Sequence, residues 1–143
     1  MSILTAEIQA KAESLMQQGD SFKERSQYRD ALKAYMEVYA ALPDPKEDWD
    51  MAILLFNKLG DCHFELQEYG AADYFYNQVL LCDDGLGIAE AWLGIGKSRF
   101  ELGDMTKARE ALLSAYMLGG EEVYIHKDDK YLKFLESGTP LNR

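Results

Sequence analysis

Three residues with reactive side chains follow one another in the sequence: Asp61, Cys62 and His63. Such side chains can bind a metal or form a nucleophile with its base. A zinc site needs three or four ligands, but the only other histidine, His126, lies far away and no third ligand follows at metal spacing. Adjacent helical residues point about 100° apart, so Cys62 and His63 are not a catalytic pair. We therefore expect no enzyme, no metal centre and no cofactor.

The composition limits the class of protein. With 143 residues, 48% of them hydrophobic, residues 1–143 fit one domain with a real core. The net charge of −10 would repel the phosphates of nucleic acids; it favours either solubility alone or a basic partner. The longest apolar run, residues 51–56, is too short to cross a membrane, and the first residues lack the pattern of a secretion signal. The two cysteines, not in a CxxC arrangement, are expected to be reduced. We expect a cytoplasmic protein that binds neither nucleic acid nor membrane.

The sequence contains three similar segments, each with a glycine at the same place. A large apolar residue precedes the glycine by four positions, an alanine follows it by twelve, a bulky residue by sixteen and a small or medium residue by nineteen. Where two antiparallel helices cross closely, only glycine or alanine fits, and large residues fill the space beside the crossing. The pattern predicts three helical hairpins, and no segment alternates cleanly enough to be a strand. The three sets are Leu15, Gly19, Ala31, Tyr35 and Val38; Phe56, Gly60, Ala72, Tyr76 and Val79; and Trp92, Gly96, Ala108, Leu112 and Ala115.

These spacings resemble the tetratricopeptide repeat, with copies over about residues 12–45, 53–86 and 89–122. The resemblance implies an all-α, right-handed superhelix of three hairpins. Two departures occur. The aromatic three residues after the glycine is kept in the first copy, as Phe22, but is His63 and Arg99 in the others, and only the first copy closes with a proline. Cys62 occupies the small-residue position that is serine in the other copies, which predicts a packing role.

The spacing between copies predicts elongated leading helices. The repeat glycines lie 41 and then 36 residues apart, compared with about 34 in the ideal repeat. Seven extra residues are about two helical turns. We expect the second leading helix to start near residues 44–47, capped by Asp44, with Trp49 on its inward stripe. The first would have the same extension, capped near Thr5, and the third would be shorter.

The C-terminal segment, residues 121–138, is expected to cover the last hairpin. Gly119 and Gly120 supply a stop, and Asp128 could cap a final helix that ends at Gly138. A terminal helix of this kind protects the exposed face of a short solenoid. Its apolar residues are Tyr131, Leu132, Phe134 and Leu135.

The resemblance also implies a binding groove. In tetratricopeptide repeats the first helices of the hairpins line a concave face that usually binds an extended peptide or a helix of a partner. Acids outnumber bases among the matching residues, so a basic, partly apolar protein partner fits best. The alternative is that these are only solvated helix faces; Phe64 and Phe100, predicted to be exposed on neighbouring helices, argue against it. The predicted lining is Met16, Asp20, Lys23, Glu24, Asn57, Asp61, Phe64, Glu65, Glu90, Leu93, Lys97, Phe100 and Glu101.

One known class of partner fits poorly. Family members that grip the acidic C-terminal tails of heat-shock chaperones use a clamp of Lys, Asn and Arg. The matching residues here include a single lysine, so a chaperone tail is disfavoured. They are Met16, Asp20, Lys58, Glu90 and Gly94.

A closer resemblance covers about residues 20–135. The stretches PDPKEDWDMA, LGDCHFELQEYGAAD and SAYMLGGEEVYIHKDDKYLKFL look like small stand-alone bacterial repeat proteins, whose ending runs roughly AYMGxGxEIF…EDPKYxxFL; Asp129 replaces the proline. The resemblance implies an immunity protein that sequesters a toxin encoded beside it, and the acidic surface would suit a basic toxin domain such as a nuclease. The alternatives are a cytoplasmic chaperone for a secretion substrate and a general adaptor.

Overall fold

The computed structural model describes residues 4–124 and 129–138. These residues form seven α-helices and three short 3-10 helices, and none of them lies in a strand. The all-α prediction is therefore confirmed. The α-helices are α1 (Ala6–Glu24), α2 (Tyr28–Ala41), α3 (Ala52–Glu65), α4 (Tyr69–Leu80), α5 (Ala89–Glu101), α6 (Met105–Gly119) and α7 (Asp129–Gly138), and the 3-10 helices are η1 (Lys46–Asp48), η2 (Gly85–Gly87) and η3 (Gly120–Val123).

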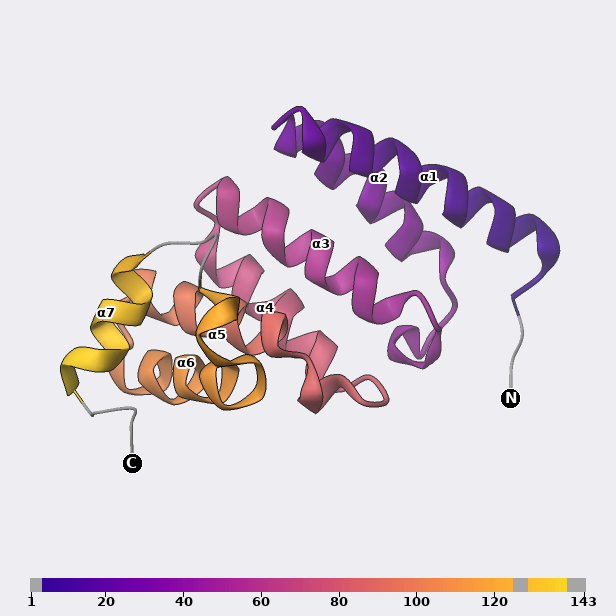
Figure 1. The fold of residues 1–143 in the computed structure, drawn as a ribbon. Coiled ribbons are helices and arrows are strands. Elements are labelled where there is room, and N and C mark those ends of the chain that lie inside the picture. Colours follow the sequence, from indigo (N-terminus) through magenta and orange to yellow (C-terminus); the bar gives the residue numbers. More distant parts are fainter. Residues whose placement is uncertain (1–3, 125–128, 139–143) are drawn as a thin grey trace.

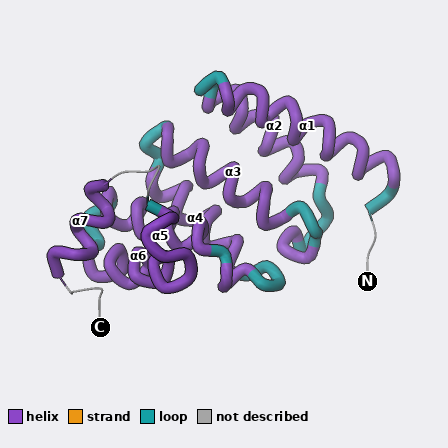
Figure 2. Tube along the Cα trace, viewed as in Figure 1, coloured by secondary structure: helices purple, strands orange, loops and turns teal. Residues whose placement is uncertain are grey.

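The helices pair in chain order as three hairpins, α1 with α2, α3 with α4, and α5 with α6. The hairpins stack side by side, with α1 at one end of the molecule and α7 at the other, packed against α6 (Figure 1). Short loops join most of the helices, as the teal segments in Figure 2 show. Each hairpin therefore contacts mainly its neighbours, as in a solenoid.

The repeat glycines are the points where the two helices of a hairpin meet most closely. A Cβ atom at Gly60 would lie 2.7 Å from a ring carbon of Tyr76, closer than real side chains approach. The pairs in the other hairpins are Gly19 with Tyr35 and Gly96 with Leu112. The repeat alanines on the opposite helices, Ala31, Ala72 and Ala108, are completely buried. The crossing predicted from the spacing is confirmed.

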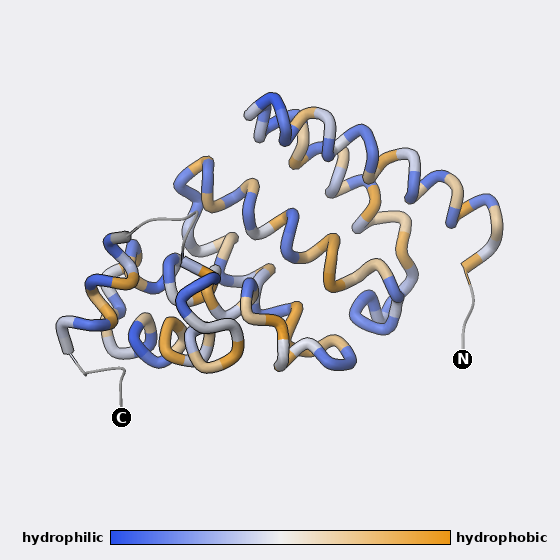
Figure 3. The backbone as a smooth tube through the Cα atoms, in the orientation of Figure 1, coloured by the Kyte–Doolittle hydropathy of each residue, from blue (hydrophilic) through white to orange (hydrophobic). Residues whose placement is uncertain are grey.

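The first helix is long, as predicted. α1 has 19 residues, and the Thr5 Oγ1 atom accepts a hydrogen bond of 3.1 Å from the backbone N–H of Ile8 at its start. At the end of the stack this helix buries only Ala12, Met16 and Gly19. Figure 3 accordingly shows α1 as mostly hydrophilic, whereas hydrophobic and hydrophilic stretches alternate along α3.

The predicted extension of the second leading helix is wrong. α3 begins at Ala52 and has 14 residues, close to the 13 of α5. The preceding segment folds back on the end of α2, because Trp49 Nε1 donates a hydrogen bond of 2.6 Å to the carbonyl oxygen of Pro43. Lys46 Nζ donates to the carbonyl oxygens of Tyr39 and Leu42, at 2.8 and 2.6 Å. These bonds give the extra residues a fixed place outside the helix.

The end of the third hairpin agrees with the prediction. α6 stops at Gly119–Gly120, where Gly120 has φ +68°, a conformation that favours glycine. The final helix ends at Gly138 and buries Tyr131 and Leu135 against the last hairpin. The predicted cap, Asp128, lies outside the described residues.

Candidate functional site

An open groove of about 540 Å³ lies along the leading helices α1, α3 and α5. Seven of its ten lining residues belong to the predicted set. The predicted lining did not include the other three, Tyr28, Lys58 and Tyr76. The complete lining is Asp20, Lys23, Glu24, Tyr28, Lys58, Asp61, Phe64, Glu65, Tyr76 and Lys97.

The floor of the groove in the first hairpin is built around Asp20. Its Oδ1 atom accepts a hydrogen bond of 2.5 Å from the Tyr35 hydroxyl and one of 2.7 Å from Lys58 Nζ. Burial acts to raise the pKa of this carboxyl, but the bonds from Lys58 and Tyr35 outweigh it, and the pKa is lowered from its ordinary value of 3.8. Asp20 is thus held charged and in a fixed position.

The second hairpin repeats this arrangement around Asp61. The Tyr76 hydroxyl donates a hydrogen bond of 2.6 Å to Asp61 Oδ1, and Lys23 Nζ lies 3.5 Å from Asp61 Oδ2. Lys58 of α3 therefore pairs with Asp20 of α1, while Lys23 of α1 pairs with Asp61 of α3. These two ion pairs connect α1 and α3 across the floor of the groove. It also orients the polar side chains without a ligand.

An aromatic side chain, Phe64, adds an apolar surface to the groove. Its ring meets Tyr69 edge-on at a centroid distance of 5.2 Å, and Lys97 Nζ of the next leading helix lies 4.5 Å from its centroid. Phe64 is half-buried, so part of its surface remains accessible. The groove can therefore contact both polar and apolar groups of a ligand.

The groove is less acidic than the sequence indicated. Its lining contains four carboxylates and three lysines, an excess of one negative charge. The predicted lining left out Lys58, and the structure pairs Asp20 and Asp61 with lysines. Glu24 and Glu65 are exposed, and within the described part of the chain they have no hydrogen bond or ion pair. These two acids are the ones available to a ligand.

Three other predicted residues of the leading helices lie outside this groove. Met16 is 8% exposed and belongs to the core, where it reaches a second groove. Asn57 is half-buried, and its Oδ1 atom has no hydrogen-bond partner among the described residues. Glu90 is exposed in the first turn of α5, about two turns from Lys97. The repeat register alone did not indicate how far along each helix the groove extends.

Three further predicted residues are covered by the C-terminal helix or the core around it. The Phe100 ring meets Tyr131 and Phe134 of α7 edge-on, at 5.4 and 5.1 Å between centroids. Glu101 accepts a hydrogen bond of 2.6 Å from the Tyr131 hydroxyl, and Leu93 is 4% exposed in the same cluster. Phe64 and Phe100, both predicted to be exposed, are both half-buried, and the final helix packs against Phe100.

The reactive cluster in the sequence is divided among three environments. Asp61 lines the groove, Cys62 is completely buried and His63 is half-buried, stacked on Phe75 at 5.6 Å between centroids. Burial raises the pKa of the Cys62 thiol to about 12, so the thiol stays protonated and unreactive. No group of acidic, cysteine and histidine side chains among the described residues could hold a metal ion. The packing role predicted for Cys62 agrees with its burial.

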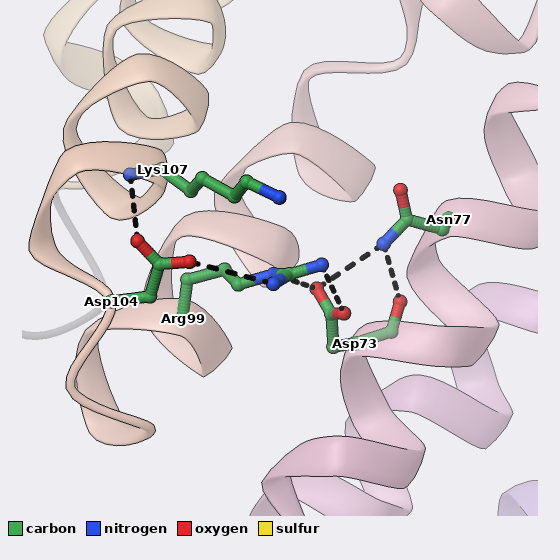
Figure 4. Close-up of polar contacts among 5 residues, drawn as sticks. All are labelled: Asp73, Asn77, Arg99, Asp104 and Lys107. Atoms are coloured by element: carbon green, nitrogen blue, oxygen red, sulfur yellow. Dashed lines mark hydrogen bonds and ion pairs between the residues drawn. The ribbon is translucent and has the colours of Figure 1, made fainter.

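The two departures from the aromatic position form polar contacts with an acid five residues later. His63 Nδ1 lies 2.8 Å from Glu68 Oε1, and Arg99 Nη1 lies 3.6 Å from Asp104 Oδ2. Arg99 also donates a hydrogen bond of 3.0 Å from Nε to Asp73 of α4, as Figure 4 shows. These contacts span the turns of the second and third hairpins, and the Asp73 contact connects these two hairpins.

Comparisons with known proteins agree with this architecture. Residues 90–115, within the third hairpin, match the family model described as tetratricopeptide repeat. The first tetratricopeptide domain of Spaghetti (RPAP3), solved with the HSP90 peptide SRMEEVD, is similar with a TM-score of 0.70 and 18% identity, covering 90% of each chain. The fold is that of a tetratricopeptide-repeat domain.

Two other tetratricopeptide structures show the same likeness. The second such domain of human RPAP3, in complex with the HSP70 peptide SGPTIEEVD, has a TM-score of 0.70 and 19% identity over 91% of this chain and 96% of that one. The Sgt2 domain from Aspergillus fumigatus has a TM-score of 0.67 and 18% identity over 93% and 77%. The expected right-handed superhelix is consistent with these tetratricopeptide folds.

The sequence has no significant match among curated proteins. None of the described helices combines the length and the apolar character needed to span a membrane.

Proposed function

We propose that this chain is a non-catalytic module that holds a segment of a protein partner in the groove along α1, α3 and α5. The supporting observation is the fixed floor of that groove, where the Asp20–Lys58 and Asp61–Lys23 pairs orient polar groups toward an open space of about 540 Å³. A site that is ordered before binding loses less entropy when the partner arrives. The fold and its peptide-bound neighbours support the same general role.

The partner that fits best is basic and partly apolar. Glu24 and Glu65 offer carboxylates that a lysine or arginine of the partner can reach without breaking the pairs of the floor. Phe64, next to Glu65 on α3, offers an apolar surface in the same groove, close to Lys97 of α5. The net charge of −10 would also attract a basic domain over a longer range and increase its rate of association.

An acidic peptide fits less well, although similar domains have been solved with one. The peptide SRMEEVD bound to RPAP3 has two glutamates and an aspartate. In this chain the Lys58 amine is only 2.7 Å from Asp20, and Asp61 lies beside Lys23. An acidic ligand would have to compete with these carboxylates for the lysines, which disfavours it.

In its most specific form, the proposed role is that of a bacterial immunity protein, which neutralises a cognate toxin in the cytoplasm. The resemblance over residues 20–135 and the acidic net charge support it. A chaperone for a secretion substrate is the second candidate, because it would use the same groove to hold an unfolded segment. A general adaptor would use it for a segment of another protein.

Coexpression with the product of the adjacent gene tests the toxin hypothesis. An immunity protein should form a tight complex that weakens with salt, and it should restore growth of cells that produce the toxin. The absence of both effects would refute this role. An immunity protein should bind the folded domain, whereas a chaperone should bind an isolated unstructured peptide of its partner equally well.

Charge reversal in the groove tests the binding surface. The double variant Glu24→Lys with Glu65→Lys should weaken the complex about tenfold or more, since it places two cations where the partner is basic. The matched control is Glu110→Lys with Glu121→Lys, which makes the same change in net charge at exposed residues outside the groove. Equal effects of the two double variants would show that only net charge matters and would contradict the groove assignment.

A further inference from the structure

A second groove, of about 640 Å³, lies between α1 and the segment that leads into α3. Its walls are mainly apolar and come from Leu4, Met16, Trp49, Met51 and Leu54. Leu54 keeps 56% of its surface exposed, so its side chain is accessible to a ligand in this groove. This groove is larger than the first, and its volume lies within the range of about 300 to 1,000 Å³ typical of ligand pockets.

Two deviations from the ideal repeat create the second groove. One wall is the additional length of α1, which at 19 residues exceeds the other leading helices. The other wall includes Trp49, which lies in the seven extra residues between the first two hairpins. Trp49 is fixed by its hydrogen bond of 2.6 Å to the carbonyl oxygen of Pro43. The groove is therefore preformed, and a plain 34-residue repeat would lack it.

The charges around the second groove have one sign. Its lining includes three acids, Glu13, Asp48 and Asp50, and no lysine or arginine. Glu13 Oε2 accepts a hydrogen bond of 2.8 Å from Gln9, which leaves its negative charge in place. Asp48 and Asp50 are exposed and have no ion pair among the described residues. An apolar side chain flanked by cationic residues is the chemistry that such a groove complements.

The second groove continues the first along the same two helices. On α1, Gln17 lines the second groove and Asp20, three residues later, lines the first. On α3, Leu54 lines the second groove and Lys58, four residues later, lines the first. Residues three or four apart share one helix face. A single segment can therefore occupy both grooves.

We infer that the second groove binds a bulky apolar side chain, flanked by lysine or arginine, from the same partner segment that occupies the first groove. This inference rests on the proposed function and specifies its partner: a basic segment with an apolar anchor at one end. The acids of the second groove contact the cations beside the anchor, and Glu24 and Glu65 contact those farther along the segment.

A display library of random dodecapeptides, selected on the whole protein, tests the inference. The enriched peptides should contain a Trp, Phe, Leu or Met next to lysine or arginine. Leu54→Asp should weaken their binding about tenfold or more. The matched control is Leu81→Asp, which changes the same residue type at 62% exposure outside both grooves and should change affinity less than about twofold.

A second measurement locates the peptide. Trp49 has an indole N–H signal that ¹⁵N NMR resolves and that Trp49→Phe assigns. This signal should shift when an enriched peptide binds, and not when the version with alanine at the apolar anchor binds. Replacing Asp48 and Asp50 by asparagine should weaken the binding of peptides that have lysine beside the anchor. It should leave the binding of peptides with norleucine at that position unchanged.

The outcomes separate this inference from the proposed function. If Glu24→Lys with Glu65→Lys weakens binding but Leu54→Asp behaves like Leu81→Asp, the second groove is not a binding site and the proposed function stands. If no peptide is enriched, or if neither set of variants affects the enriched peptides, both are overturned.

Discussion

The hydroxyl of Tyr76 lies 2.6 Å from Oδ1 of Asp61, while its ring fills the space between Gly60 and Gly94. A Cβ atom would lie 2.7 Å from the ring at Gly60 and 2.5 Å at Gly94. One side chain thus closes its own hairpin, packs against the next leading helix and positions an acid in the groove. The shape of the groove depends on the packing of the hairpins beneath it.

Removal of the Tyr76 hydroxyl should measure this dependence. Tyr76→Phe keeps the ring but deletes the hydrogen bond to Asp61, so the free energy of unfolding should fall by about 1 to 2 kcal/mol. Urea denaturation gives this value. The control, Tyr116→Phe, removes a hydroxyl that has no hydrogen bond among the described residues, and it should cost less than about 0.5 kcal/mol. Equal losses would contradict a structural role for the Tyr76–Asp61 bond.

The Asp20–Lys58 pair should make the stability of the fold depend on pH. Burial acts to raise the pKa of Asp20, but the bonds from Lys58 and Tyr35 lower it below 3.8 in the folded protein. A carboxyl with a lowered folded pKa adds stability above its unfolded pKa, and that stability is lost as the pH falls through the folded pKa. Lys58→Met should therefore reduce stability at pH 7, and its difference from wild type should shrink as the pH falls below 3.8 and through the folded pKa of Asp20.

Urea denaturation of both proteins at several pH values checks this expectation. Other carboxyl groups titrate in wild type and variant alike, so the difference between the two isolates the pair. In ¹³C NMR the Asp20 carboxyl should titrate at a higher pH in Lys58→Met. A difference in stability that stays constant while the Asp20 carboxyl titrates in the NMR spectrum would show that Lys58 acts only by packing.

The hairpins could be predicted from the sequence because their signals are local. Gly60 and Ala72 are small where two helices must approach closely, and Tyr76 is large beside them; the same spacing recurs in each copy. Such residues report contacts within one hairpin, which depend little on the rest of the chain. The capping of α1 by Thr5 is local in the same sense.

Contacts between distant segments account for what the sequence did not indicate. Lys58 neutralises Asp20 from 38 residues away, and the helix that covers Phe100 begins 29 residues later. The extra residues before α3 match a helical extension in the first copy and have no counterpart in the third, so the repeat does not show whether they extend the helix. The hydrogen bond from Trp49 to Pro43 decides that they do not. The charge of the groove and the side chains it leaves accessible depend on these tertiary contacts, whereas the helices that line it follow from the repeat.

The ion pairs between hairpins should contribute unequally. Arg99 and Asp73 expose 28% and 13% of their side chains, whereas Arg29 and Glu68 expose 67% and 37%. Arg99 contacts both carboxylate oxygens of Asp73, at 3.0 and 2.9 Å. Alanine double-mutant cycles should give about 1.5 to 3 kcal/mol for Arg99–Asp73 and less than about 1 kcal/mol for Arg29–Glu68. A larger coupling energy for the exposed pair would contradict this order.

The helix crossing itself can be tested at Ala72, which is completely buried in the second hairpin. Ala72→Glu would place a carboxylate in the core without a partner, and the free energy of unfolding should fall by at least about 3 kcal/mol. The control, Gly70→Glu, adds the same charge to the first turn of α4, where a side chain meets open space. An acid near a helix N-terminus is favourable, so this variant should be at least as stable as wild type. Urea denaturation followed by circular dichroism compares the two variants, and a loss below about 1 kcal/mol for Ala72→Glu would mean that the hairpin can open at its crossing.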